Sequence, residues 1–153
     1  MNKSRVIVSL DFPDAKQAIE FCHKIDPIHC KIKIGKELFT AEGPKLIEKL
    51  RALDFEIFLD LKYHDIPNTV ANACRVAADL DVWMLNIHAA GGRNMMEAAY
   101  ESLTKSRRSK NPPLLIAVTL LTSISSDDLL ELGITKSVED QVLLLSKLAK
   151  SSG

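Results

Sequence analysis

Four charged residues have the types and spacing that proton-transfer chemistry needs. Asp60 and Lys62 stand two apart in a run of strand-forming residues, so their side chains point to the same side of that strand. Asp65 follows in a turn, and Lys33 belongs to the preceding strand-like segment. A lysine held among carboxylates stays protonated, because each charge is flanked by its opposite. Such an ammonium group stabilises a developing negative charge and then donates a proton.

A single ion pair of this kind would be interpreted as a salt bridge that only supports the fold. Four charges that converge at one end of neighbouring strands favour a functional site instead, because perturbed charged groups gather where chemistry takes place.

Short apolar runs alternate with longer amphipathic stretches along the chain. The runs predict strands at 5–10, 30–34, 56–61, 82–88 and 114–121, and the stretches predict helices at 14–25, 44–53, 67–80, 94–104 and 138–150. This alternation predicts a parallel sheet within one domain that covers residues 1–153.

The side-chain parity of the predicted strands identifies the type of sheet. Four successive strands have one aliphatic face and one face that becomes polar toward its carboxyl end, as in Ile57, Leu59 and Leu61 against Phe58, Asp60 and Lys62. An open sheet covered by helices on both faces would bury those charges under apolar helices, which is energetically costly. The pattern therefore predicts the first five strand–helix units of an α/β (β/α)8 TIM barrel, with the active site at the carboxyl rim.

Composition excludes several classes of function. The 153 residues carry no net charge, 46% are hydrophobic and 26% are charged, which argues against a broad nucleic-acid or anionic-membrane surface. The basic segment 105–110 is interpreted as a solvated helix end. No apolar run approaches membrane-spanning length, and the first strand begins too early for a leader. Cys22, Cys30 and Cys74 lack metal-site spacing and predict reduced thiols in a cytoplasmic protein.

The segment from Asp60 to Thr69 resembles the hallmark of the orotidine 5′-phosphate decarboxylase family, Asp-x-Lys-x-x-Asp-Ile-x-x-Thr. Further ordered blocks resemble bacterial members at residues 9–11, 33–37, 86–92 and 117–123. Asp-x-Lys alone would be a weak signal, but blocks in order along the whole chain make the resemblance specific.

The resemblance implies a cofactor-free and metal-free conversion of orotidine 5′-phosphate to UMP, and a role for each matching residue. Lys62 would protonate C6 of the pyrimidine, and Asp60 would face the carboxylate that is lost. Asp11 and Lys33 would bind ribose hydroxyls, and Lys33 would also join the charged array. Asp65 and Thr69 would reach the partner's substrate across a homodimer interface. The remaining substrate contacts, to the pyrimidine ring, would come from Thr122 and Ser123.

The length of the chain conflicts with a closed barrel. A compact (β/α)8 barrel needs over about 200 residues, and only five strands are predicted here. Strands 6–8, which carry the phosphate-binding residues in the family, are absent from the 153 residues. We therefore expect these residues to be a portion of a longer protein, and a polypeptide of these residues alone to be inactive.

Two other functions remain open. A sugar-phosphate decarboxylase or aldolase of the same superfamily shares the Asp-x-Lys-x-x-Asp array but uses Mg²⁺, held partly by a carboxylate where this sequence has Lys33. A truncated, non-catalytic dimerisation module is the alternative from another class.

Among the neighbouring residues, His88 is interpreted as a barrel-lining histidine, the Gly91–Gly92 pair as a tight turn, and Met95 and Met96 as core or interface residues.

Overall fold

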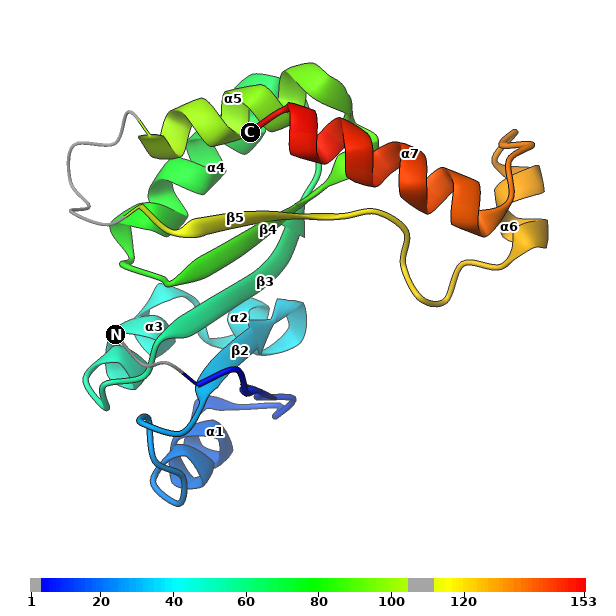
Figure 1. Ribbon diagram of the computed structural model, residues 1–153. Helices are drawn as coiled ribbons and strands as arrows, with labels where there is room; N and C mark the ends of the chain where they lie inside the picture. The colour runs from blue at the N-terminus through cyan, green and yellow to red at the C-terminus, as the bar shows by residue number, and fades with distance from the viewer. Residues whose placement is uncertain (1–3, 105–111) are drawn as a thin grey trace.

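The computed structural model describes residues 4–104 and 112–153. Its centre is a five-stranded parallel sheet in the order β1-β2-β3-β4-β5, so each strand lies beside the next along the chain (Figure 1). The strands are β1 (Ile7–Ser9), β2 (Lys31–Gly35), β3 (Ile57–Tyr63), β4 (Met84–His88) and β5 (Leu114–Val118). Sequential strand order with no reversal is the arrangement of a (β/α) barrel rather than of a doubly wound sheet.

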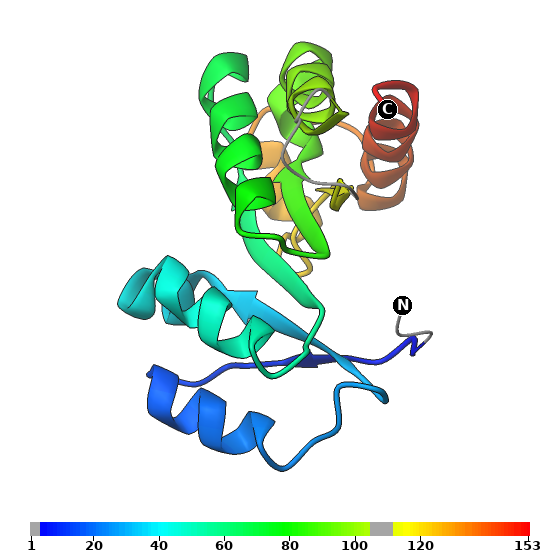
Figure 2. The same cartoon turned by 90° about the vertical axis from the view of Figure 1, so that its left-hand side faces the viewer.

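Helices cover the outer side of the curved sheet, except the short helix that follows β5, which lies away from the sheet (Figure 1 and Figure 2). The helices are α1 (Ala15–Cys22), α2 (Lys36–Glu42), α3 (Pro44–Arg51), α4 (Pro67–Asp79), the single 3₁₀ turn η1 (Ala89–Gly91), α5 (Gly92–Thr104), α6 (Ser126–Glu131) and α7 (Val138–Ser151). Local chemistry begins several of them: Asp14 and Ser137 accept backbone N–H bonds as N-caps, and Pro67 stands in the first turn of α4.

The hydrophobic core lies between the sheet and these helices. The outward-facing residues of the three central strands are at most 2% exposed: Ile32, Ile34, Ile57, Leu59, Leu85 and Ile87. Burial of one such side chain stabilises the fold by about 1.5–3 kcal/mol. The helices add Met95 and Met96, which are 1% and 3% exposed, as predicted for core residues. This packing fixes the outer face, and with it the direction in which the inner side chains point.

The predicted secondary structure is largely confirmed, with two omissions. All five strands and all five predicted helices are present, but α2 and α6 were not predicted. β5 ends at Val118 rather than at residue 121, and β3 continues to Tyr63. The register of β3 with β4 shifts after Leu59, but Asp60 and Lys62 still lie on the same face, as predicted.

The two outer strands differ from the central ones in exposure. Ile7 of β1 is 39% exposed, and Leu114 and Ile116 of β5 are 53% and 41% exposed. Pairing in register puts Leu114 beside Met84 and Ile116 beside Asn86, on the inner face. The inner face is therefore apolar and open toward β5.

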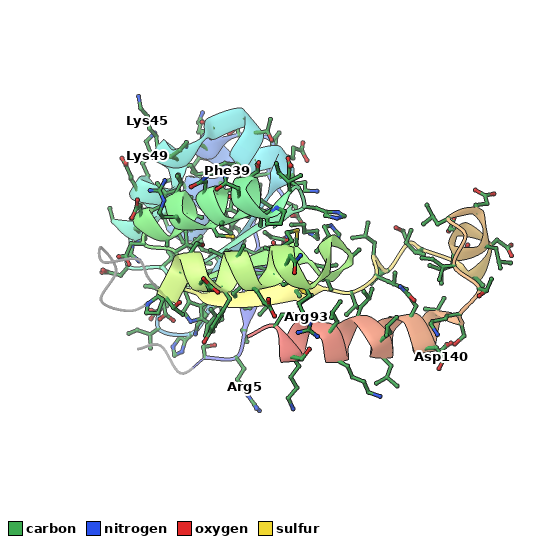
Figure 3. The ribbon with its side chains drawn as sticks, turned by 90° about the horizontal axis from the view of Figure 1, so that it is seen from above. Arg5, Phe39, Lys45, Lys49, Arg93 and Asp140 are labelled. Carbon is green, nitrogen blue, oxygen red and sulfur yellow. The ribbon has the colours of Figure 1, made fainter. Side chains whose placement is uncertain are left out.

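The last helix packs on the core through Leu145, and one side chain of α5 adds hydrogen bonds to its end. Arg93 donates hydrogen bonds to the backbone oxygen and to the hydroxyl of Ser151, at 3.1 and 3.0 Å, and lies against α7 in Figure 3.

The basic segment 105–110, interpreted above as a helix end, lies outside the described residues. Within the part of the chain that the structure describes, no helix is both long and apolar enough to cross a membrane.

Candidate active site

The carboxyl ends of β1, β2 and β3 bring charged side chains to one place on the inner face. Lys33 of β2 pairs in register with Ser9 and Phe58, and Gly35 pairs with Asp60. A cavity of about 240 Å³ opens there, and its lining includes Asp11, Lys33, Asp60 and Lys62. The convergence predicted from spacing is observed for Lys33, Asp60 and Lys62, whereas Asp65, the fourth predicted charge, does not line the cavity.

Asp60 is the centre of this cluster. Its Oδ1 lies 2.6 Å from Lys62 Nζ, and its Oδ2 lies 3.3 Å from Lys33 Nζ. The residue is 8% exposed. Burial alone would raise the pKa of Asp60, but hydrogen bonds from Lys62, Asn86 and Lys33 outweigh burial and hold the pKa below its ordinary value of 3.8. The carboxylate is therefore ionised at neutral pH.

The hydrogen bonds of Asp60 include one that the sequence did not reveal. Asn86 of β4 is 2% exposed; its Nδ2 donates to Asp60 Oδ1 at 2.6 Å, and its Oδ1 accepts from the Lys62 backbone N–H at 2.8 Å. In the predicted strand 82–88, Asn86 alternates with Leu85 and Ile87 and so shares the polar inner face, but spacing alone assigns it no role. A buried amide on a strand next to charged residues was the available signal, because such an amide needs hydrogen-bond partners.

Asp11 lies at the edge of the cluster. Its Oδ1 is 3.8 Å from Lys33 Nζ and accepts a hydrogen bond from the Ser9 hydroxyl at 2.7 Å. The Asp11 side chain is 78% exposed, whereas that of Lys33 is 24% exposed. Both groups retain open hydrogen-bonding capacity on the side of the cavity.

The other predicted site residues lie outside the cluster. Asp65 is exposed, and its Oδ1 accepts from the Ile66 N–H at 2.6 Å; among the described residues it forms no ion pair. Thr69 is exposed in the first turn of α4. Thr122 and Ser123 are exposed on the connection from β5 to α6, which extends away from the sheet in Figure 1. The structure brings none of these four to the lysines.

Two histidines stand beside the cluster. The rings of His64 and His88 lie 5.5 Å apart, and His88 is the last residue of β4. Burial first, and then the charges of His64, Lys36 and Lys62, lower the pKa of His88, so that its neutral form is favoured. The predicted turn at Gly91–Gly92 is confirmed, because Gly92 has φ 83° where α5 begins.

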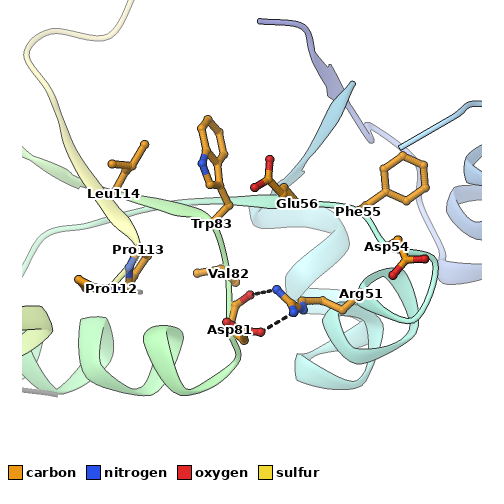
Figure 4. A pocket seen from close by; sticks show the side chains of 10 residues that line it. All are labelled: Arg51, Asp54, Phe55, Glu56, Asp81, Val82, Trp83, Pro112, Pro113 and Leu114. Carbon is orange, nitrogen blue, oxygen red and sulfur yellow. Dashed lines mark hydrogen bonds and ion pairs between the residues drawn. The ribbon is translucent and has the colours of Figure 1, made fainter. Parts of the chain in front are cut away.

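A larger hollow of about 530 Å³ lies at the opposite, amino end of the strands (Figure 4). Three of the four charged side chains described in its lining are already matched: Arg51 is ion-paired with Asp81, and Glu56 Oε2 lies 3.0 Å from Lys31 Nζ. Lys31 also donates to the Ser4 backbone oxygen at 3.0 Å and lies 4.8 Å from the Trp83 ring. Size alone would favour this hollow, but the chemistry favours the smaller one, where charged groups of the cluster still face open space.

The donor set gives no support for a metal centre. Among residues 4–104 and 112–153, no three His, Cys, Asp or Glu side chains lie close enough to hold a metal ion. Beside Asp60, where a cation would need carboxylates, the neighbours are two ammonium groups. A divalent cation there would be repelled by Lys33 and Lys62.

The sheet and the cluster together define a class of protein. Five sequential parallel strands, helices outside, and a charged cluster at the carboxyl rim are features of a barrel enzyme of the (β/α) type, present here in part. A profile described as the orotidine 5′-phosphate decarboxylase / HUMPS family matches residues 4–153. The chain belongs to that family.

Curated relatives and solved structures agree with this assignment. Orotidine 5′-phosphate decarboxylase of Hydrogenovibrio crunogenus is 54% identical over 149 residues, which is 97% of this chain and 62% of that protein. The one from Psychromonas ingrahamii is 56% identical over 149 residues, 97% of this chain and 63% of that protein. A crystal structure of the Lactobacillus acidophilus decarboxylase superposes with a TM-score of 0.90 at 41% identity, covering 99% of this chain and 69% of that one.

The chain spans a little under two thirds of the length of the curated relatives that it matches. The five strands described here therefore correspond to a part of the fold of those relatives.

Proposed function

We propose that this chain carries the catalytic rim of an enzyme that decarboxylates orotidine 5′-phosphate to UMP, in pyrimidine biosynthesis, without a cofactor. Membership of the family supports the substrate class. The observation that carries the proposal is the geometry at Asp60, whose two oxygens lie 2.6 Å from Lys62 Nζ and 3.3 Å from Lys33 Nζ beside an open cavity.

The chemistry follows from the charges. The bond from C6 of the pyrimidine to its carboxylate breaks, CO₂ leaves, and the electron pair stays on C6. With no adjacent group to delocalise that pair, the Lys62 ammonium stabilises it electrostatically and then gives its proton to C6. Asp60 would repel the substrate carboxylate by about 4 kcal/mol at 4 Å and an effective dielectric near 20. We rank Lys62 above Asp60, because its attraction grows as the carbanion forms.

The remaining roles follow the family resemblance. Asp11 and Lys33 would bind ribose hydroxyls, and their open hydrogen-bonding capacity supports this assignment. Thr122 and Ser123 would contact the pyrimidine once the connection after β5 folds over the substrate. Asp65 and Thr69 would serve the site of a second subunit, which their exposure permits. The whole enzyme would be a cytoplasmic homodimer.

A polypeptide of these 153 residues alone would be inactive. The inner face is open beside Leu114 and Ile116, so water would reach the cluster from the β5 side. Water weakens the electrostatic stabilisation on which the reaction depends. The phosphate-binding residues of the family would also be missing.

A chimera tests this proposal. Residues 1–153 are followed by the segment of the Hydrogenovibrio crunogenus decarboxylase that lies beyond its matching residues, and CO₂ release from orotidine 5′-phosphate is measured. We expect turnover by the chimera and none by the 153-residue chain. Full turnover by the short chain would contradict its predicted inactivity. A folded chimera that neither binds UMP nor releases CO₂ would favour the non-catalytic module.

The second candidate function is that of the Mg²⁺-dependent sugar-phosphate enzymes. It stays a candidate because the family description names a second group beside the decarboxylases. The position of Lys33, 3.3 Å from Asp60, argues against a divalent cation at that carboxylate. Adding EDTA to the chimera separates the two proposals. Unchanged turnover supports the cofactor-free reaction, and loss of turnover that Mg²⁺ restores would support the rival.

Shared active sites have their own test. Chimeras with Lys62→Ala or Asp65→Ala are prepared separately and then mixed under conditions that exchange subunits. If Asp65 serves the neighbouring subunit, mixed dimers contain one intact site and recover up to about a quarter of normal turnover, by random pairing. No recovery, with subunit exchange verified by mass, would refute a shared site.

A further inference from the structure

We propose that Asn86 is a positioning residue that holds Asp60 and Lys62 in their reactive arrangement; this inference rests on the proposed decarboxylation. Asn86 is not itself among the residues that line the cavity. Its effect would pass through the two residues to which it is hydrogen-bonded.

The amide of Asn86 uses both of its ends. Nδ2 donates to the Asp60 carboxylate at 2.6 Å, and Oδ1 accepts from the Lys62 backbone N–H at 2.8 Å. The orientation of the amide follows from its partners, since a carboxylate only accepts and a backbone N–H only donates. Asn86 therefore connects one side chain and one backbone group that are two residues apart on β3.

The backbone of β3 explains why such a connection is needed. Leu59 pairs with Leu85 and Tyr63 pairs with Ile87, so three residues of β3, 60 to 62, lie opposite Asn86 alone. Lys62 takes a left-handed conformation with φ 53°, which is unfavourable for a residue with a side chain. Its N–H cannot join a regular ladder there, and the Asn86 side chain accepts its hydrogen bond instead.

The same amide sets the rotation of the Asp60 carboxylate. Oδ1 receives both Asn86 Nδ2 and Lys62 Nζ, which leaves Oδ2 directed to Lys33 Nζ. Each lysine therefore meets one carboxylate oxygen. If the amide is removed, the carboxylate is free to turn and the Lys62 backbone is free to relax, so that the ammonium group moves from its place.

Two substitutions test this role in the chimera. Asn86→Ala removes both hydrogen bonds. Asn86→Asp keeps the shape of the side chain. Only the protonated carboxyl group can donate a hydrogen bond to Asp60 while it accepts one from the Lys62 backbone N–H. Ser152→Ala is the matched control, because Ser152 is also buried, at 6% exposure, and hydrogen-bonded to the backbone, but lies at the end of α7.

Kinetics should separate positioning from general support of the fold. We expect Asn86→Ala to lower kcat by about 10- to 100-fold, the range for a lost hydrogen bond to a charged group, with KM changed by less than about threefold. The kcat of Asn86→Asp relative to the unmodified chimera should rise as the pH falls, by up to about tenfold per pH unit, because one proton must be bound. Ser152→Ala should stay within about twofold of the unmodified chimera at each pH.

A titration in the 153-residue chain needs no turnover. The carboxyl carbon of Asp60 is followed by NMR against pH and assigned with Asp60→Asn. Loss of the Asn86 donor should raise the pKa of Asp60, because that hydrogen bond favours the ionised form.

The two measurements distinguish the possible failures. If Asn86→Ala keeps kcat within twofold, or if the pH profile of Asn86→Asp matches that of the unmodified chimera, the positioning role is wrong. An unchanged Asp60 titration in folded Asn86→Ala also refutes it. If the unmodified chimera shows no turnover while the titration shifts as expected, the proposed function fails and the hydrogen-bond role of Asn86 stands.

Discussion

Lys31 and Lys33 stand two apart on β2, point to the same face, and meet different surroundings. Lys31 is 4% exposed, and Glu56, the Ser4 carbonyl and the Trp83 ring surround its ammonium group. Lys33 has a side chain that is 24% exposed, with Asp60 at 3.3 Å, Asp11 at 3.8 Å and open space beyond. A buried ion pair such as that of Lys31 supports the fold, whereas an ion pair beside an open cavity, as at Lys33, is available to bind a ligand. The predictions below test that contrast.

The largest effect is expected at the residue that would give its proton away. Lys62→Ala should lower kcat of the chimera by about 10³-fold or more, because the general acid and the cation beside the carbanion are lost together. Initial rates of CO₂ release measure the change. A rate within tenfold of normal would place the main stabilisation elsewhere than on Lys62.

Exchanging the two lysines of β2 for methionine tests the contrast directly. Lys33→Met should lower kcat/KM by about 10²-fold and change the free energy of unfolding by less than about 1 kcal/mol, because its ion pairs are partly exposed. Lys31→Met should leave kcat/KM within about threefold but cost about 2 kcal/mol of stability, since Glu56 is left at a largely covered site. Urea unfolding and steady-state kinetics check both variants, and equal behaviour of the two would remove the contrast.

Acid should weaken the cluster at the rim. The pKa of Asp60 is lower in the folded chain than its ordinary value of 3.8, so its ionised form contributes stability above that value. This contribution is lost as the pH falls through the folded pKa. The stability difference between the unmodified chain and Asp60→Asn should therefore narrow from about pH 6 toward pH 3 in urea titrations. A constant difference would mean that the cluster does not stabilise the ionised carboxylate.

The smallest effect concerns the closed, outer side of the sheet. Burial raises the pKa of Cys22 to about 11 and that of Cys74 to about 12. Since only the thiolate reacts, a thiol reagent at about pH 8 should label both residues far more slowly in the native chain than in urea. Rapid native labelling of Cys74 would show that the core beneath α4 opens readily.

The sequence predicted the strands, the barrel type and the convergence of Lys33, Asp60 and Lys62, because hydrophobic parity determines which side chains share a face. It missed α2, a short helix whose N-cap, Gly35, offers no side-chain bond. It also missed α6, although Ser125 and Asp128 form a capping box that was readable in the sequence.

The irregular backbone at Asp60–Lys62 could not be predicted from local residue propensities. No propensity predicts a lysine with positive φ, because Asn86, 24 residues further along the chain, supplies the partner that supports this conformation. The places of Thr122 and Ser123 relative to the cluster depend likewise on how the connection after β5 runs, and no repeating pattern of side chains specifies that course.

The left-handed backbone at Lys62 has a consequence for how this position tolerates change. A side chain in that conformation costs about 1–2 kcal/mol relative to the right-handed form, a cost that glycine escapes. A screen for heat resistance alone would therefore accept glycine at residue 62, whereas growth that depends on UMP synthesis would reject it. If glycine at residue 62 is accepted for stability but rejected for growth, then lysine is kept there for its chemistry, although the backbone conformation favours glycine.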